Sequence, residues 1–207
     1  MKRVLIVVAA LLALSTMVTA QSQVKPVVYV GGGLALPLSP EGFSDGWKMG
    51  YGFGGGVGIQ LDPSMELIGK VFYNTFPLDD DKLLEGTTGI TVDGGDFQFL
   101  EFGADFKYIL MANAPDAKFK PFLIGGLGMT NIKVSDFTIA GDGESVMFPF
   151  GDYSETKFSL GAGAGFDYMF SPKAGVWLEA RVHVVMTEGD SFTYLPVRAG
   201  VKFLFGQ

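Results

Sequence analysis

The 207-residue chain, long enough for one ordinary domain, carries 15 Lys and Arg against 22 Asp and Glu, a formal net charge of −7, and contains no Cys. The excess of acid argues against nucleic acid as a partner, because phosphate binding needs a basic face. The lack of Cys excludes disulfides and lipid attachment at a cysteine. Its 30 Gly, 19 Phe and 7 Tyr are spread over alternating segments, which is typical of membrane β-barrels.

The first 20 residues have the features of a secretory signal peptide. A charged start at Met1 to Arg3 is followed by apolar residues 4–14 and by the small-x-small cleavage site Val18-Thr19-Ala20. The apolar stretch is too short to span a bilayer, which takes ~20 residues. We therefore expect residues 1–20 to be removed and residues 21–207 to form one outer-membrane β-barrel domain, with 13 basic and 22 acidic residues and a formal charge of −9.

Alternating apolar side chains predict eight strands in the exported domain. The second strand is the clearest, because Met49, Tyr51 and Phe53 begin one face while glycine fills nearly every position of the other. A helix would not carry glycine at every second position. The predicted strands are residues 27–37, 49–61, 65–75, 97–110, 119–131, 156–170, 175–187 and 193–205.

The connections between these strands alternate in length. The predicted short turns with Pro are 62–64, 113–116 and 171–173, and the predicted polar loops are 38–48, 76–96, 132–155 and the brief 188–191. In an up-and-down barrel every second connection lies at the same end, and outer-membrane barrels place turns in the periplasm and loops outside the cell. The predicted fold is an all-β, eight-stranded, antiparallel up-and-down transmembrane β-barrel.

The polar face of the predicted strands decides which side of the wall faces lipid. Periodicity alone also fits a soluble lipocalin-like barrel with an apolar interior. The polar face has nearly balanced charge with much glycine between, which suits a paired interior network better than a soluble surface. The predicted lumen charge network consists of Glu66, Lys70, Glu101, Asp105, Lys107, Lys157, Asp167, Glu179, Arg181, His183, Arg198 and Lys202.

The number of strands limits the width of the barrel interior. Eight strands enclose a space just wide enough for side chains to fill. Long Lys and Arg side chains that reach across a glycine-lined wall are expected to plug it, which argues against a wide pore. The glycines themselves are expected to make room for bulky neighbours and to let strands curve, rather than to line a water path.

The last predicted strand, 193–205, carries a candidate assembly signal. Arg198, Gly200, Phe203 and Phe205 resemble the terminal β-signal by which the outer-membrane assembly machinery recognises its clients. In that family the aromatic residue is usually the final one, whereas two further residues follow Phe205 here. The resemblance implies an assembly signal at Gly200, Phe203 and Phe205 and the barrel-assembly machinery as a partner during biogenesis.

Residues 27–205 resemble the outer-membrane β-barrel domain family that includes the transmembrane domain of outer membrane protein A and its small relatives. The resemblance rests on the Gly-rich second strand after Gly46-Trp47-Lys48, the turn at Asp62-Pro63, the start of the fifth strand at Pro121-Phe122 with its following glycines, and the closing strand. It implies location in the outer membrane of a Gram-negative-type bacterium, with lipid and lipopolysaccharide as partners. Family members serve as anchors, minor channels, adhesins or lipid-modifying enzymes, so the fold does not name the function.

His183 is the single histidine and the strongest candidate for catalysis. Outer-membrane acyl hydrolases and transferases use His with Ser and an acidic residue, but the hydrolase pattern places Ser two residues after the His, where this chain has Val185. His183 also falls on the predicted inner face, where a hydrogen-bonded histidine is the simpler interpretation. One histidine without cysteine excludes an ordinary zinc site. We therefore predict no catalytic residue, no metal site and no cofactor.

The predicted loops are strongly acidic. They include Asp79-Asp80-Asp81, Asp93-Gly94-Gly95-Asp96 and Asp142-Gly143-Glu144, none of which has the spacing of a calcium-binding hand loop. Solvated loop tips are the main interpretation. The alternative is that divalent cations bind these carboxylates and bridge them to lipopolysaccharide phosphates.

The leading functional prediction is a non-enzymatic integral outer-membrane protein with a structural role in the envelope, a plugged lumen and acidic extracellular loops. The first alternative is a narrow channel for small or hydrophobic solutes. The others are an enzyme that modifies lipid A acyl chains through His183, and an adhesin whose partner binds residues 76–96 or 132–155.

Overall fold

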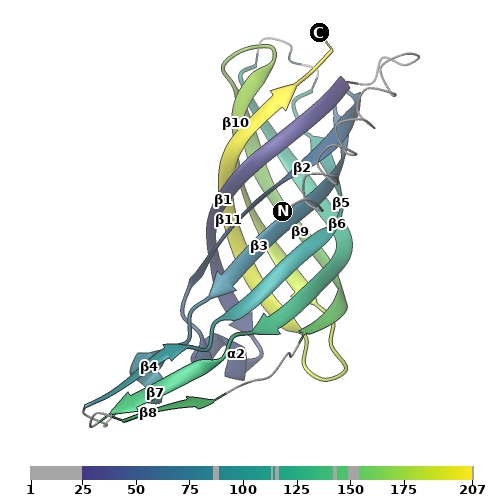
Figure 1. Ribbon diagram of the computed structural model, residues 1–207. Coiled ribbons are helices and arrows are strands. Elements are labelled where there is room, and N and C mark those ends of the chain that lie inside the picture. The colour runs from purple at the N-terminus through teal and green to yellow at the C-terminus, as the bar shows by residue number, and fades with distance from the viewer. Residues whose placement is uncertain are drawn as a thin grey trace, which may run out of the picture.

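The computed structural model describes residues 25–85, 89–112, 114, 117–141, 144–148 and 154–206. The predicted signal peptide, 1–20, lies outside the described residues, as does most of the predicted turn 113–116. Eight long strands form a closed barrel in the order β1-β11-β10-β9-β6-β5-β3-β2, and every neighbouring pair is antiparallel (Figure 1). The predicted fold class is confirmed. The barrel strands are β1 (Lys25–Ser39), β2 (Gly50–Asp62), β3 (Met65–Phe76), β5 (Phe97–Ile109), β6 (Phe119–Val134), β9 (Ser154–Met169), β10 (Ala174–Val185) and β11 (Phe192–Leu204).

Closure between β1 and β11 depends on glycine at the point of closest packing. Gly31 pairs with Gly200 in the antiparallel register. A Cβ atom on Gly31 would lie 2.5 Å from the Trp177 ring, and one on Gly200 would lie 2.9 Å from the same ring. The two glycines therefore make room for an indole inside the barrel, which is a common use of glycine in strands.

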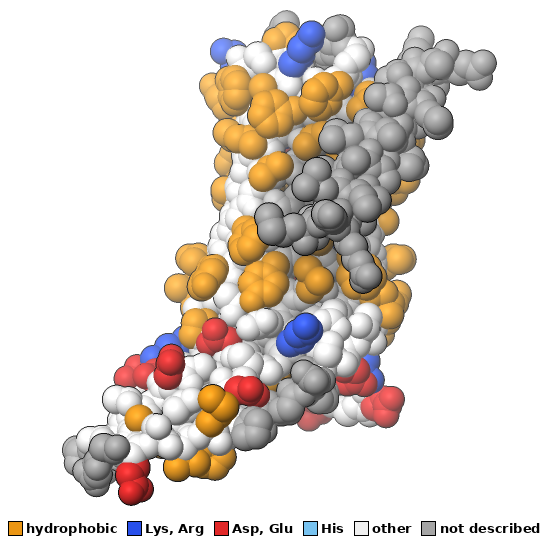
Figure 2. Space-filling model, viewed as in Figure 1, with side chains coloured by type: hydrophobic (Ala, Val, Ile, Leu, Met, Phe, Trp, Pro, Cys, Tyr) orange, Lys and Arg blue, Asp and Glu red, His pale blue; other side chains and the backbone are white. Residues whose placement is uncertain are grey.

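The outer wall of the barrel is apolar. Phe102, Phe106 and Val201 are 42%, 45% and 39% exposed, and hydrophobic side chains are spread along the part of the barrel wall that Figure 2 shows. Acidic side chains on this face gather at the loop end. The wall thus presents to its surroundings the alternate, apolar set of each strand, as a lipid-facing barrel requires.

Among the described residues, helices are short, and none combines the length and the apolar character that a membrane-crossing helix needs.

The predicted loops contain regular structure, so their assignment as plain loops was wrong in part. The first holds α2 (Glu41–Gly46) and the second holds α3 (Asp80–Leu83). Strands β4 (Ile90–Gly94), β7 (Phe137–Gly141) and β8 (Glu144–Phe148) pair as a separate sheet in the order β4-β7-β8, which projects beyond the barrel (Figure 1). Their pairing places Val92 beside Ile139 and Ile139 beside Val146. This short alternation supports strands, although acidic and glycine neighbours conceal it in the sequence.

Helix α2 places an aromatic side chain in the loop end of the barrel. The Phe43 ring lies 5.1 Å from that of Phe76, 5.2 Å from Phe97 and 5.4 Å from Phe192. Such distances are favourable for aromatic pairs. We call this cluster the aromatic layer; it comprises Phe43, Phe76, Phe97, Phe99, Phe192 and Tyr194.

Candidate functional site in the barrel interior

Eleven of the twelve residues predicted for the lumen network are buried inside the barrel. Five are acidic, five are basic and the eleventh is His183, so the charges cancel when the imidazole is neutral. Ion pairs arrange the ten charged residues in three layers, and the His183 ring lies beside Glu101 in the third. The turn-side layer comprises Glu66, Lys107, Asp167 and Lys202, the middle layer Lys70, Asp105, Glu179 and Arg181, and the loop-side layer Glu101, His183 and Arg198.

The turn-side layer crosses the barrel. Lys202 Nζ lies 2.6 Å from Glu66 Oε1 and 2.7 Å from Asp167 Oδ2, and Lys107 Nζ lies 2.7 Å from Asp167 Oδ1. Tyr29 donates its hydroxyl hydrogen to Glu66 and accepts a hydrogen bond of 3.1 Å from Lys107. Several strands therefore meet through one charged cluster, and each buried charge has a partner of opposite sign, as burial requires.

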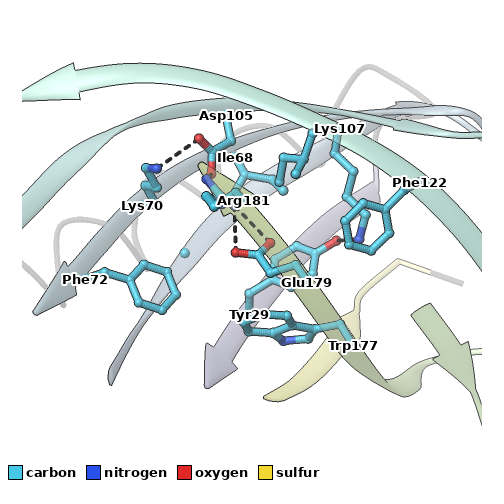
Figure 3. A pocket seen from close by; sticks show the side chains of 12 residues that line it. Tyr29, Ile68, Lys70, Phe72, Asp105, Lys107, Phe122, Trp177, Glu179 and Arg181 are labelled. Carbon is cyan, nitrogen blue, oxygen red and sulfur yellow. Dashed lines mark hydrogen bonds and ion pairs between the residues drawn. The ribbon is translucent and has the colours of Figure 1, made fainter. Parts of the chain in front are cut away.

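The middle layer centres on Arg181 (Figure 3). Its guanidinium donates to Asp105 Oδ2 at 2.9 Å and to Glu179 Oε2 at 2.9 Å. Lys70 Nζ lies 3.1 Å from the other oxygen of Asp105. Because a guanidinium offers several donors in a fixed plane, it can hold carboxylates from two strands at once.

The loop-side layer is built around Glu101, which is 1% exposed. Its Oε1 accepts from Arg198 at 2.8 Å and from the Asn74 amide at 2.7 Å, and the hydroxyl of Tyr194 also donates to it. The Arg198 guanidinium carbon lies over the Phe72 ring, 4.0 Å from its centroid. Lys70 Nζ, 3.7 Å from Glu101 Oε2, links this layer to the middle one.

Two of the predicted residues need separate comment. Lys157 is not part of the buried network. It lies near the loop end of β9 and pairs with Glu155 and with the exposed Glu188. Strand alternation assigns Lys157 to the inner face, but alternation cannot show that this end of the strand extends beyond the buried interior. His183 Nδ1 lies 3.8 Å from Glu101 Oε2, and its ring is 5.0 Å from that of Tyr194. His183 is inside the barrel as predicted, but among the described residues neither ring nitrogen has a hydrogen-bond partner, so the prediction of a hydrogen-bonded histidine was wrong. The interior position of His183 separates the imidazole from lipid acyl chains on the outer wall.

Three polar residues that bond directly to carboxylates of the interior are missing from the predicted network. Tyr29, Asn74 and Tyr194 are buried and bond directly to Glu66 or Glu101. Their strand positions could have identified two of them, since Asn74 shares the face of Lys70, and Tyr194 shares that of Arg198. Tyr29 lies among small apolar residues and three glycines, where alternation gives little signal.

A cavity of about 30 Å³ lies between the middle and turn-side layers and is lined by Lys70, Lys107 and Arg181 among others (Figure 3). One water molecule needs roughly 10–15 Å³, so the space suits about two. The Nε–H group of Arg181 has no hydrogen-bond partner among the described residues. Water in this cavity would be a suitable partner for such a group.

Comparison with known proteins identifies the barrel. The family model described as an outer membrane protein beta-barrel domain matches residues 6–205. The chain belongs to this family. As an outer membrane protein beta-barrel domain, it lies in the outer membrane of a Gram-negative-type bacterium.

Solved structures show the same fold at low sequence identity. Neisserial surface protein A is 17% identical with a TM-score of 0.54, and the match covers 89% of this chain and 98% of that one. A major outer membrane protein of Thermus thermophilus is 14% identical with a TM-score of 0.53, covering 89% and 100%. Ail, the attachment invasion locus protein of Yersinia pestis, is 16% identical with a TM-score of 0.50, covering 88% and 100%. None of the curated protein sequences gives a significant match.

In the acidic loops of this outer-membrane domain, the side-chain ammonium group of Lys48 lies among three carboxylates. Lys48 Nζ lies 2.6 Å from Asp80 and 2.7 Å from Asp81, with Asp79 at 3.8 Å. The hydrogen bond from Lys48 lowers the pKa of Asp80, and the same bond raises the pKa of Lys48. The ammonium thus lies where a metal ion would have to bind these three carboxylates. In the second predicted acidic motif, burial raises the pKa of Asp96. The third predicted acidic motif, which begins at Asp142, lies largely outside the described residues.

The residues of the predicted assembly signal lie on the last strand and just beyond it. Phe203 is 41% exposed on the outer wall, and Phe205, 52% exposed, follows the end of β11 at Leu204. Gly200 packs against the Trp177 ring. The strand therefore shows its terminal aromatic side chains to the exterior, while its charged residues Arg198 and Lys202 point inward.

Proposed function

We propose that this protein is a non-enzymatic structural component of the outer membrane whose lumen is plugged by its own side chains. The observation that carries the proposal is the layered network of ion pairs that spans the interior between β3, β5, β9, β10 and β11. A channel needs a continuous path for its solute, whereas these side chains bond to each other across the barrel.

Two further features support a closed interior. The aromatic layer, with Phe43, Phe76, Phe99 and Tyr194 at most 1% exposed, lies on the loop side of the network. The cavity of about 30 Å³ in the interior suits water molecules rather than a sugar or an amino acid. A solute would therefore have to separate buried ion pairs and move packed aromatic rings to cross, and separating buried ion pairs is costly.

The interior position of His183 supports a role without catalysis. The outer wall touches lipid acyl chains, and the imidazole lies on the other side of that wall beside Glu101 and Tyr194. Ser159, a serine of the neighbouring strand, is bonded to Thr130 at 2.9 Å. A reaction on lipid A acyl chains would need these groups to reach the exterior.

The partners follow from the surfaces. The apolar wall contacts outer-membrane lipid, and the acidic loops face the lipopolysaccharide. Divalent cations would bridge loop carboxylates to its phosphates, with the carboxylates outside the Lys48 cluster as the candidates. The barrel-assembly machinery would bind the β11 segment with Gly200, Phe203 and Phe205 during insertion.

Conductance measurements test the plugged lumen. The purified protein, inserted into planar bilayers in potassium chloride, is expected to give no steady current steps, because the ion pairs and the aromatic layer fill the interior. Liposomes carrying it are expected not to swell in small sugars, and protection of the barrel from trypsin would verify insertion. A Lys157→Gln variant, altered at the loop-end rim alone, should behave identically. Reproducible single-channel steps in the wild-type protein would contradict the plug and support the narrow-channel alternative.

A further inference from the structure

A second cavity, of about 490 Å³, lies at the turn end of the barrel. We call it the mouth cavity. It is lined from both sides of the barrel, by residues of β1, β2, β5, β6, β9 and β11 and of the short turns. Its volume is in the range of small-molecule sites, roughly 300–1,000 Å³. Since the turns face the periplasm, a ligand would enter from that compartment.

Of the four lysines that line the mouth cavity, Lys202 is paired within the turn-side layer, and the other three give the cavity a positive charge. Lys25, Lys118 and Lys120 line it, and within the described part of the chain no carboxylate lies within ion-pair distance of their ammonium groups. Lys25 begins β1 and Lys120 is the second residue of β6, and these strands are four places apart in a closed ring of eight. The cations therefore lie on opposite walls and face the same space.

Within the described part of the chain, the carboxylates near the mouth cavity already have partners. Glu66 and Asp167 are held by Lys202 at 2.6 and 2.7 Å, and Lys107 binds Asp167 from the other side. Asp62 Oδ1 accepts hydrogen bonds from the Ser64 backbone and hydroxyl. The three lysines consequently keep a net positive charge in a chain whose overall charge is −7.

Apart from Gln60, Ser171 and the paired Lys202, the remaining lining of the mouth cavity is apolar. Ile109 and Leu204 are 2% and 7% exposed, and Met169 and Ala112 lie beside them. A ligand that fits both parts carries an anionic group for the lysines and a short apolar group for this lining. Lysine suits phosphate as a point charge without demanding a fixed approach angle.

We propose that the mouth cavity binds small amphiphilic phosphates from the periplasmic side, with the phosphate between Lys25 and Lys120 and the apolar group against Ile109 and Leu204. The proposal is independent of the plugged lumen, because the ligand binds at the end of the barrel and does not cross it. The phosphate has two possible sources, a soluble phosphate ester and the headgroup of an anionic phospholipid.

Methyl NMR of the full chain in phosphatidylcholine nanodiscs tests this site with hexyl phosphate as the probe. The methyl signals of Ile109 and Leu204 are expected to shift in a saturable titration, and inorganic phosphate should bind at least about tenfold more weakly because it lacks the apolar group. The double variant Lys25→Gln, Lys120→Gln should lose at least about tenfold in affinity. Lys173→Gln is the matched control, since Lys173 belongs to the same end but does not line the cavity.

The outcomes separate the alternatives. Unchanged spectra of the free variants would show that the barrel is intact. Competition by phosphatidylglycerol in the nanodisc would identify a lipid headgroup as the source, and binding that phosphatidylglycerol leaves unchanged would identify a soluble ester. Absence of saturable shifts at Ile109 and Leu204, or equal affinity in the double variant and wild type, would overturn the site, whatever the conductance experiment shows.

Discussion

Replacing Glu101 with alanine is expected to lower the free energy of unfolding by about 3–5 kcal/mol, the usual cost of removing one partner from a buried ion pair. The variant leaves the guanidinium of Arg198, 1% exposed, without the carboxylate that it contacts at 2.8 Å. It also removes the acceptor of the Tyr194 hydroxyl and of the Asn74 amide. Urea titration of the protein folded in lipid vesicles measures the loss.

Two controls make the Glu101 experiment specific. Glu188→Ala removes a carboxylate that is 97% exposed and 3.6 Å from Lys157, so its effect should stay within about 0.5 kcal/mol. The double variant Glu101→Leu, Arg198→Met replaces both charges by apolar groups and should recover most of the loss, because paired replacement of buried charges is often neutral. A Glu101→Ala protein as stable as the Glu188→Ala protein would mean that water, not protein, solvates Arg198.

Leu127→Arg is expected to destabilise the folded barrel in lipid by about 2–4 kcal/mol, the cost of a cation on a lipid-facing wall near the bilayer midplane. Leu127 lies in the middle of β6, pairs with Ala104 and Leu160 on the outer wall, and is 60% exposed. The same urea titration in vesicles measures the change.

Leu83→Arg provides the matched control for the lipid-facing wall. Leu83 is similarly exposed, at 57%, but lies in α3 at the loop end. Its replacement should alter stability by no more than about 0.5 kcal/mol, as surface changes usually do. Equal effects of the two arginine variants would show that the surface around Leu127 is in contact with water.

The period-two pattern was sufficient to predict most of the barrel from the sequence. It located all eight strands to within a few residues and placed Glu101, Asp105 and Arg181 on one interior face, because a strand facing lipid must show its apolar set outward. The same rule assigned Phe102 and Phe106 to the outer wall, where they lie.

Contacts across the barrel could not be predicted in this way. Lys107 and Asp167 are 60 positions apart, and their pairing depends on how the strands are staggered when the sheet closes. The alternation predicts no role for inward aromatic residues such as Phe99. An apolar residue at a position of the polar face looks like an exception to the alternating pattern. The pairing of β4 with β7 joins two separate loops, and no local pattern specifies it.

Quenching of tryptophan fluorescence by brominated acyl chains tests the central claim, an apolar wall in lipid around a charged interior. The chain has two Trp, so Trp47→Phe leaves Trp177, 4% exposed inside the barrel, as the single reporter. Adding Phe102→Trp to that background places a second indole on the wall. We predict that brominated lipid strongly quenches the fluorescence of the tryptophan added at position 102 and quenches the fluorescence of Trp177 several-fold less. Strong quenching of Trp177 with none of the added emission would contradict the orientation of the barrel.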